Sequence, residues 1–236
     1  MVTDPVSRTT LAVVAVDKQG ERTFSFYRDP SADVNLRAEE ISDEQLKNTK
    51  FLHFGSVSLT TDPARTATLH AAKTAKGYGA VISYDPNYRA SLWSDEATAI
   101  ERMLEPLTMV DVLKVSDEEL PLLTGTENLE DGSRILADKG IALVLVTLGA
   151  NGAFYRFKDC TGHVPGMKVK VGDTNGAGDT FFGATLAQLA KFDKLNDVTV
   201  EELEKILAVS NKAAGITTSR HGAIPAMPTK EEVFGV

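Results

Sequence analysis

The residues best suited to chemistry are concentrated in one stretch, 173–179, with the sequence Asp-Thr-Asn-Gly-Ala-Gly-Asp. Glycines let the backbone approach a ligand closely, and the free N–H groups at a helix N-terminus attract anions. Asp179 falls at the start of the helix that follows, where the helix dipole favours a charged carboxylate. A carboxylate beside a bound phosphate can accept the proton of a substrate hydroxyl. The pattern predicts an anion-binding turn with a catalytic base beside it.

The spacing excludes two other phosphate-binding motifs. Gly176, Gly178 and Gly183 do not form G-x-G-x-x-G, and no Lys-Ser or Lys-Thr pair closes a P-loop. An ordinary helix start with an aspartate cap is the structural alternative. Apolar residues alternate with lysines over 167–171 and recur at helical spacing after 181, so the stretch is predicted to join a strand to a helix.

Residues 173–179 resemble the C-terminal signature of the ribokinase-like (PfkB) carbohydrate kinases, and the resemblance runs from Arg8 to the C-terminus. It implies that the N–H groups of Gly176, Ala177 and Gly178 stabilise the transferring phosphoryl group while Asp179 acts as the base. The implied reaction is ATP-dependent transfer of the γ-phosphoryl group to a sugar hydroxymethyl group, with fructose as the expected acceptor. Two alternatives are a kinase acting on 2-keto-3-deoxygluconate or another sugar acid, and a non-catalytic nucleotide- or sugar-binding remnant.

Apolar strands alternate with helices along the chain, which predicts an α/β protein with a mostly parallel sheet covered on both faces. The expected strands are 51–59, 80–84, 110–115, 141–148 and 153–157, and the expected helices are 63–76, 95–107, 133–139 and a long one opened by a capping box at 199–202. The resemblance implies a ribokinase-like three-layer sandwich formed by a single domain, 1–236, with 8–30 as part of a small β-lid.

The N-terminal region is predicted to be a hairpin. Small and branched apolar residues alternate over 11–16, residue types alternate again over 22–28, and a turn is expected between them at 18–21. Phe26 and Arg28 share one face of the second strand. An ordinary hairpin with a solvated arginine is one interpretation. The resemblance instead implies a lid over the sugar, with Phe26 and Arg28 as substrate-binding residues.

Turns after the strands are expected to carry the other ligand contacts, because ligands bind beyond the carboxyl ends of parallel strands. Residues 85–89, Asp-Pro-Asn-Tyr-Arg, are either a plain loop or, as the resemblance to a D-x-N-x-R element implies, a substrate-binding turn presenting Asn87 and Arg89. Asp179 would also contact the substrate hydroxyl. A sugar acid could pair its carboxylate with Arg28 and Arg89.

The nucleotide and the metal are expected at three further turns. Ser116 and Glu119 form a capping box, which is structural by itself. The resemblance to an N-x-x-E element implies that Glu119 also holds Mg²⁺ through water, with Ser116 in place of the usual Asn. ATP and Mg²⁺ are thus the implied cofactors. The implied nucleotide-binding residues are Lys114, Ser116, Thr147, Gly149, Gly152, Gly178, Asn211, Ala214, Gly222 and Ala223.

Composition narrows the remaining possibilities. The net charge is -8 without a basic block, which argues against nucleic acid as a partner. Cys160 is the only cysteine, so an internal disulfide and a cysteine-based metal cluster are excluded. No apolar run reaches membrane-spanning length, and a cytoplasmic protein is expected.

Two expectations concern assembly and completeness. The resemblance implies a homodimer that pairs through the β-lid. Members of the family begin with a strand, a Gly-Gly element and an Asn that bind the sugar, and nothing before Arg8 matches them. The domain is therefore expected to be incomplete at its N-terminus, with N-terminal strands missing and apolar surface and strand edges exposed.

Overall fold

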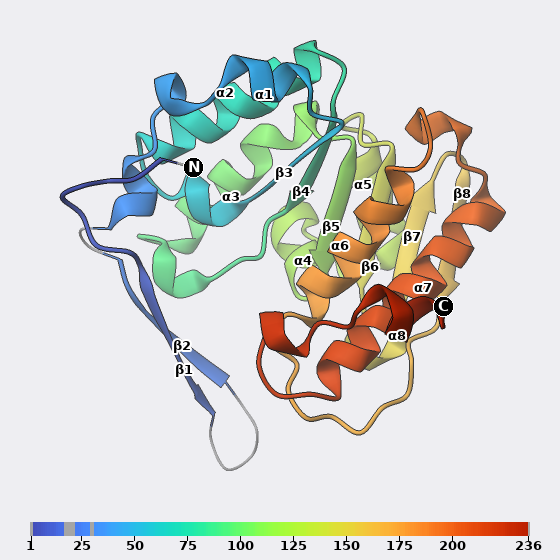
Figure 1. Ribbon diagram of the computed structural model, residues 1–236. Coiled ribbons are helices and arrows are strands. Elements are labelled where there is room, and N and C mark those ends of the chain that lie inside the picture. Colours follow the sequence, from blue (N-terminus) through green and yellow to red (C-terminus); the bar gives the residue numbers. More distant parts are fainter. Residues whose placement is uncertain (1, 17–21, 29–30, 236) are drawn as a thin grey trace. The chain divides into compact units, whose positions relative to one another are not determined.

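The computed structural model describes residues 2–16, 22–28 and 31–235 and divides into two compact units, Met1–Val110 and Asp111–Val236 (Figure 1). The assignment of 1–236 to a single domain stays a prediction. None of the helices in the described ranges combines the length and apolar character needed to cross a membrane.

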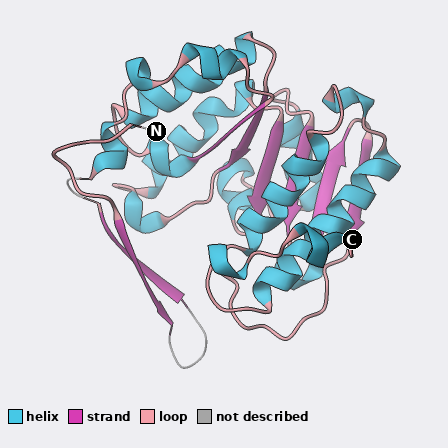
Figure 2. Ribbon diagram, viewed as in Figure 1, coloured by secondary structure: helices cyan, strands magenta, loops and turns pink. Residues whose placement is uncertain are grey.

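The first unit begins with the predicted hairpin. Strands β1 (Leu11–Val16) and β2 (Arg22–Tyr27) pair antiparallel, with Leu11 opposite Tyr27. The predicted turn at 18–21 lies outside the described residues. Figure 2 shows the hairpin extending away from the α-helices of its own unit. Leu11, Val13, Val14 and Tyr27 are exposed, so apolar side chains of this two-stranded sheet face solvent.

The rest of the first unit is built on a parallel strand pair, β3 (Phe51–Gly55) and β4 (Val81–Asp85). Helices α1 (Asp43–Lys47), α2 (Ala64–Gly77) and α3 (Glu96–Leu104) accompany it. Helix α2 connects the two strands and buries a row of small residues, Ala64, Ala67, Ala71 and Ala75, at helical spacing. Small side chains allow a helix to pack closely against its neighbours.

Two boundaries in the first unit differ from the predictions. The strand expected over 51–59 ends at Gly55 and continues as a 3₁₀ helix, η3 (Ser56–Leu59), where the Ser56 N–H donates to the Pro86 carbonyl at 3.1 Å. The helix expected over 95–107 ends at Leu104, and a 3₁₀ helix with Pro106 near its start follows. In both cases the predicted element is present, but the last residues of the apolar run form a 3₁₀ helix, whose backbone is more tightly wound.

The second unit contributes four neighbouring strands of the sheet, in the order β5 (Val112–Ser116), β6 (Leu143–Thr147), β7 (Ala153–Phe157), β8 (Cys160–Val164). Strands β5 and β6 are parallel, while β7 and β8 are antiparallel to their neighbours. Every residue of β5 and β6 except the last is buried, as expected for strands covered on both faces.

Helices cover both faces of this sheet. Helices α6 (Ala177–Leu189) and α7 (Val200–Thr218) pack side by side over one face, and α4 (Glu119–Thr124) and α5 (Leu129–Ala137) lie over the other (Figure 1). A short helix, α8 (Lys230–Phe234), ends the chain. The capping box predicted for α7 is confirmed, because Thr199 and Glu202 exchange hydrogen bonds at its start.

Three predictions in the second unit were wrong. The segment 167–171 is not a strand, because its alternating residues have no strand partner among the described residues. Strand β8 was missed, since its sequence is short and mostly polar and it forms by pairing with β7. Helix α5 begins at Leu129 rather than 133, because Asn128 caps it by accepting the Asp131 N–H at 3.0 Å.

A partly buried hydrogen bond joins the sheet to α7 and gives a pH-dependent prediction. The Tyr155 hydroxyl donates to Glu204 Oε1 at 2.7 Å, and burial together with this bond raises the pKa of Tyr155 from its ordinary 10.0 to about 12. The neutral phenol is thus favoured in the folded protein. Its contribution to the free energy of unfolding is fully present below pH 10 and is lost as the pH rises through about 12.

We expect Tyr155→Phe to lower the free energy of unfolding by about 1 kcal/mol at neutral pH and to flatten its decline in alkali. Denaturant titrations at several pH values would measure both effects. Tyr27→Phe, at an exposed position, is the matched control and should change neither. An alkaline decline equally steep in the Tyr155 variant would contradict the assignment.

Candidate active site

The anion-binding turn predicted from the sequence begins helix α6. Gly176 is the N-cap with φ +76°, a conformation that glycine adopts without strain. Its carbonyl accepts hydrogen bonds from the Thr180 N–H and hydroxyl, both at 2.8 Å. The N–H of Ala177 makes a long bond, 3.3 Å, to the Thr174 carbonyl. Asp179, the third helical residue, is exposed at this helix start, where a helix leaves its first N–H groups without intrahelical acceptors.

Asp173 connects this turn to the loop after α7. One of its carboxylate oxygens accepts the Asn175 N–H at 2.8 Å, and the other accepts the Gly222 N–H at 3.1 Å. A Cβ atom on Gly176 would lie 3.5 Å from the Cα atom of Ala223. The structure therefore brings two predicted nucleotide-binding residues, Gly222 and Ala223, to the turn. Asp173, to which the sequence analysis gave no role, holds them there.

A buried lysine also reaches the turn. Lys114, on β5, is only 6% exposed, and a Cβ atom on Gly178 would lie 3.2 Å from its Nζ atom. The absence of a side chain at Gly178 leaves room for this cation beside the helix start. A positive charge here favours an anion at the same place as the helix dipole does.

The capping box at the end of β5 is confirmed. Glu119 accepts the Ser116 N–H at 2.8 Å, and the Ser116 hydroxyl accepts the Glu119 N–H at 3.1 Å. Glu119 is 7% exposed, so its carboxylate is fixed in place. The metal-binding role of Glu119 stays a prediction. Among the described residues no three metal-binding side chains come together.

A cavity of about 350 Å³ in the second unit extends from the turn to an apolar wall. Thr174, Ala177 and Gly178 line it from the turn. Six of the residues predicted to bind nucleotide line this cavity: Thr147, Gly149, Gly152, Gly178, Asn211 and Ala214. Four residues predicted to bind nucleotide are not in the lining: Lys114, Ser116, Gly222 and Ala223. A lining that combines the helix start predicted to bind an anion with apolar side chains suited to a flat base fits a nucleotide.

The apolar wall was missed by sequence reasoning. Met167, Val169 and Val171 line the cavity from the segment that was predicted to be a strand, and Phe181 lines it from α6. The alternation that suggested a strand was the only sequence signal for this wall. Gly215 lets the segment pass close to α7, since a Cβ atom there would lie 2.9 Å from the Cβ atom of Met167.

Asn211 holds the start of this segment. Its Nδ2 group donates to the carbonyls of Val164 and Pro165 at 3.0 and 3.1 Å. Because both partners can only accept, the orientation of the amide is determined. Asn211 thus fixes a wall of the cavity.

We expect Asn211→Ala to lower the free energy of unfolding by about 1–3 kcal/mol, because it leaves two carbonyls without their donor. Affinity for ATP should fall as well, since the wall loses its attachment to α7. Denaturant unfolding and ATP titration would measure the two effects. Asn196→Ala, an exposed change before α7, is the control. Unchanged ATP affinity in a destabilised variant would show that the wall does not depend on Asn211.

Four of the five predicted substrate-binding residues lie in the first unit, whereas Asp179 lies on α6 in the second. Asn87 has φ +46°, and its N–H donates to Asp85 Oδ1 at 3.1 Å. Arg89 donates from Nη1 to the Tyr88 carbonyl at 2.9 Å. Phe26 is half-buried, and the side chain of Arg28 is 11% exposed in an ion pair with Asp33. Their substrate-binding roles stay predictions.

The α/β architecture, the glycine turn with its aspartate and the adjoining cavity fit the class of nucleotide-binding phosphotransferases. The sequence model of the pfkB family of carbohydrate kinases matches residues 1–230. The chain belongs to this family, as its resemblance in sequence indicated.

Relatives of known name agree with this assignment. The chain is 43% identical to a protein named probable fructokinase-6, chloroplastic, from Arabidopsis thaliana, and 42% identical to fructokinase-1 from Zea mays. The matches cover 98% and 99% of this chain, but it spans only 60% and 72% of the two relatives' lengths.

Solved structures show the same fold. Fructokinase from Xylella fastidiosa with bound ATP has a TM-score of 0.89 and 32% identity, covering 98% of this chain and 74% of that one. Fructokinase from Vibrio cholerae with fructose, ADP and calcium ion has a TM-score of 0.89 and 35% identity over the same shares. The predicted fold class, α/β with a mostly parallel central sheet, is confirmed, as is the predicted membership of the pfkB family of carbohydrate kinases.

Proposed function

We propose that the protein transfers the γ-phosphoryl group of ATP to a hydroxymethyl group of fructose. The observation that carries this proposal is the position of Asp179 in the first turn of α6, at a glycine turn that opens into the cavity of the second unit. The relatives named as fructokinases support fructose as the acceptor.

In the proposed reaction Asp179 orients the sugar hydroxyl and accepts its proton. The N–H groups of the turn at 176–178, together with the Lys114 ammonium, stabilise the negative charge on the phosphoryl oxygens. Phosphoryl transfer depends mainly on positioning and on charge stabilisation, so the base need not be strong. The apolar wall of the cavity holds the base of the nucleotide, and Asn211 keeps that wall in place.

Magnesium is the proposed metal, and it would neutralise the nucleotide phosphates. A carboxylate oxygen is a ligand type that Mg²⁺ prefers, and kinases commonly hold it with one or two carboxylates together with substrate phosphates and water. Glu119 fits that requirement, since it is fixed by Ser116 at the end of β5. We propose that Glu119 acts on the metal through water.

The test is a transfer assay on the natural full-length protein with ATP and Mg²⁺. We expect phosphorylation of fructose that depends on both. Preferential phosphorylation of 2-keto-3-deoxygluconate would overturn the choice of acceptor. Binding of ATP without transfer to any sugar would instead identify a nucleotide-binding protein.

We also propose that two copies pair through the β1–β2 hairpin, whose exposed apolar residues Leu11, Val13 and Tyr27 would then be covered. Light scattering should give the mass of a dimer, and Val13→Lys should give that of a monomer. A monomeric natural protein would remove this proposal. The cytoplasm is the proposed location, and cell fractionation would test it, since one relative is named as chloroplastic.

A further inference from the structure

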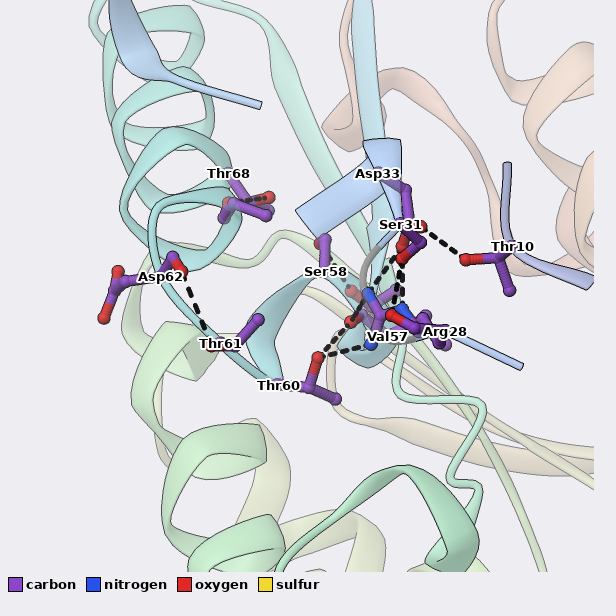
Figure 3. A network of polar contacts seen from close by, with 12 residues as sticks. Thr10, Arg28, Ser31, Asp33, Val57, Ser58, Thr60, Thr61, Asp62 and Thr68 are labelled. Carbon is purple, nitrogen blue, oxygen red and sulfur yellow. Dashed lines mark hydrogen bonds and ion pairs between the residues drawn. The ribbon is translucent and has the colours of Figure 1, made fainter. Parts of the chain in front are cut away.

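A polar network ties together the two ends of the β1–β2 hairpin (Figure 3). Arg28 follows β2, Thr10 precedes β1, and Asp33 lies in the 3₁₀ helix η1 (Ala32–Asn35). Asp33 Oδ2 accepts from Arg28 Nε at 2.8 Å and lies 2.7 Å from Arg28 Nη2 in an ion pair, while Asp33 Oδ1 accepts from the Thr10 hydroxyl. One carboxylate therefore fixes both strands of the hairpin where they leave the unit.

The carboxylate of Asp33 is held in its charged form. Burial raises its pKa, but hydrogen bonds from Thr10, Ser31 and Arg28 outweigh burial and bring the pKa below its ordinary value. Ser31 is itself 1% exposed, and its hydroxyl donates to the Arg28 carbonyl at 2.8 Å. The base of the hairpin is thus held in place by specific polar contacts.

The opposite edge of the guanidinium reaches the segment after β3. Arg28 Nη1 donates to the Thr60 hydroxyl at 2.6 Å, and Nη2 donates to the Val57 carbonyl at 3.0 Å. Thr60 is in turn fixed, because its hydroxyl donates to the same Val57 carbonyl at 2.9 Å. Each of the three nitrogens of the Arg28 guanidinium donates a hydrogen bond to one of these protein acceptors, and its charge is paired with that of Asp33.

The same segment contacts the loop that carries the predicted substrate residues. The Ser56 N–H donates to the Pro86 carbonyl at 3.1 Å, and the next residue is Asn87. Strand β2 also lies against the 3₁₀ helix η4 (Ala90–Leu92), which follows Arg89. The hairpin base, η3 and the loop 85–92 are therefore connected by direct contacts.

We propose that Arg28 is a positioning residue, which sets how the hairpin and the loop 85–92 are held relative to each other, and that it does not bind a substrate carboxylate. This inference rests on the proposed kinase function and deepens it. A guanidinium already paired with a carboxylate offers little net charge to a second one. The acceptor selected by this arrangement is a neutral sugar rather than a sugar acid.

A double-mutant cycle with Arg28→Lys and Thr60→Val in the full-length protein separates positioning from direct binding. Arg28→Lys keeps the charge but loses the planar fork, and Thr60→Val removes one anchor while leaving the guanidinium in place. We expect each change to raise the KM for fructose about tenfold, the scale of one hydrogen bond to a charged group, with the KM for ATP unchanged. The double variant should be no worse than Arg28→Lys alone.

Direct binding gives a different outcome. If Arg28 contacts the substrate, Thr60→Val frees the guanidinium and leaves the KM for fructose unchanged, while Arg28→Lys keeps its full effect. Either an unaffected Thr60→Val variant or fully additive effects would overturn the proposal. Arg134→Lys, in an exposed ion pair with Asp131 on α5, is the matched control and should leave both KM values unchanged.

Hydrogen exchange provides a readout that does not depend on catalysis. We expect the amides of β1 to exchange about tenfold faster in Arg28→Lys and in Thr60→Val than in the natural protein, since the polar contacts at the base of the hairpin are weakened. Exchange in β6 should not change. Unchanged exchange in β1 would overturn the role of Arg28 even if no sugar were phosphorylated, and failure of the kinase function alone would leave the exchange result intact.

Discussion

Asp179→Asn is expected to lower the kcat for fructose phosphorylation by about a hundredfold to ten-thousandfold, the usual range for loss of a positioned acid-base group. Asparagine keeps the size of the side chain and its place in the first turn of α6, so the helix start should be preserved. It cannot accept the proton of the sugar hydroxyl. Because a negative charge near the phosphates is also removed, affinity for ATP should be equal or higher.

Steady-state kinetics and ATP titration of the same samples would measure these effects. Asp193→Asn, at an exposed position just beyond α6, is the matched control and should stay within twofold of the natural protein. A kcat within tenfold of normal in Asp179→Asn would show that another group accepts the proton, and the proposed mechanism would have to be abandoned.

Gly152→Ala is expected to have the largest effect on stability. Gly152 has φ +94°, and a Cβ atom there would lie 2.2 Å from the Val164 carbonyl oxygen. Backbone strain costs about 1–3 kcal/mol, and displacing the neighbouring backbone costs about 1–3 kcal/mol more. The free energy of unfolding should therefore fall by about 2–6 kcal/mol, which denaturant titration would measure. The shifted segment also forms the cavity wall, so affinity for ATP should fall with it.

Gly149→Ala separates the two contributions. Gly149 has φ +55°, but a Cβ atom there would meet nothing within 4 Å. This variant should lose only about 1–2 kcal/mol, the cost of the left-handed conformation. Equal losses in the two variants would mean that the approach of the Val164 carbonyl does not matter.

Local sequence patterns predicted those features whose interactions lie close together in the chain. The helix start beside Asp179, the Ser116–Glu119 capping box and the hairpin each depend on residues a few positions apart or on strands that follow one another in the chain. The same reasoning failed for the segment 167–171, because alternation predicts a strand only when a neighbouring strand is available to pair with it. The same reasoning missed strand β8 for the opposite reason, since this strand forms by pairing with β7 although its sequence pattern is weak.

The sequence by itself determined the proposed chemistry of this protein, because the glycine turn and its aspartate are contiguous and their backbone and charge requirements are local. Only the tertiary structure decided what surrounds them. Lys114 reaches Gly178, the Val164 carbonyl passes Gly152, and Arg28 binds Thr60 across 32 positions. Such contacts join residues distant in the chain, and they form only when packing of the whole unit offsets the entropy of bringing them together.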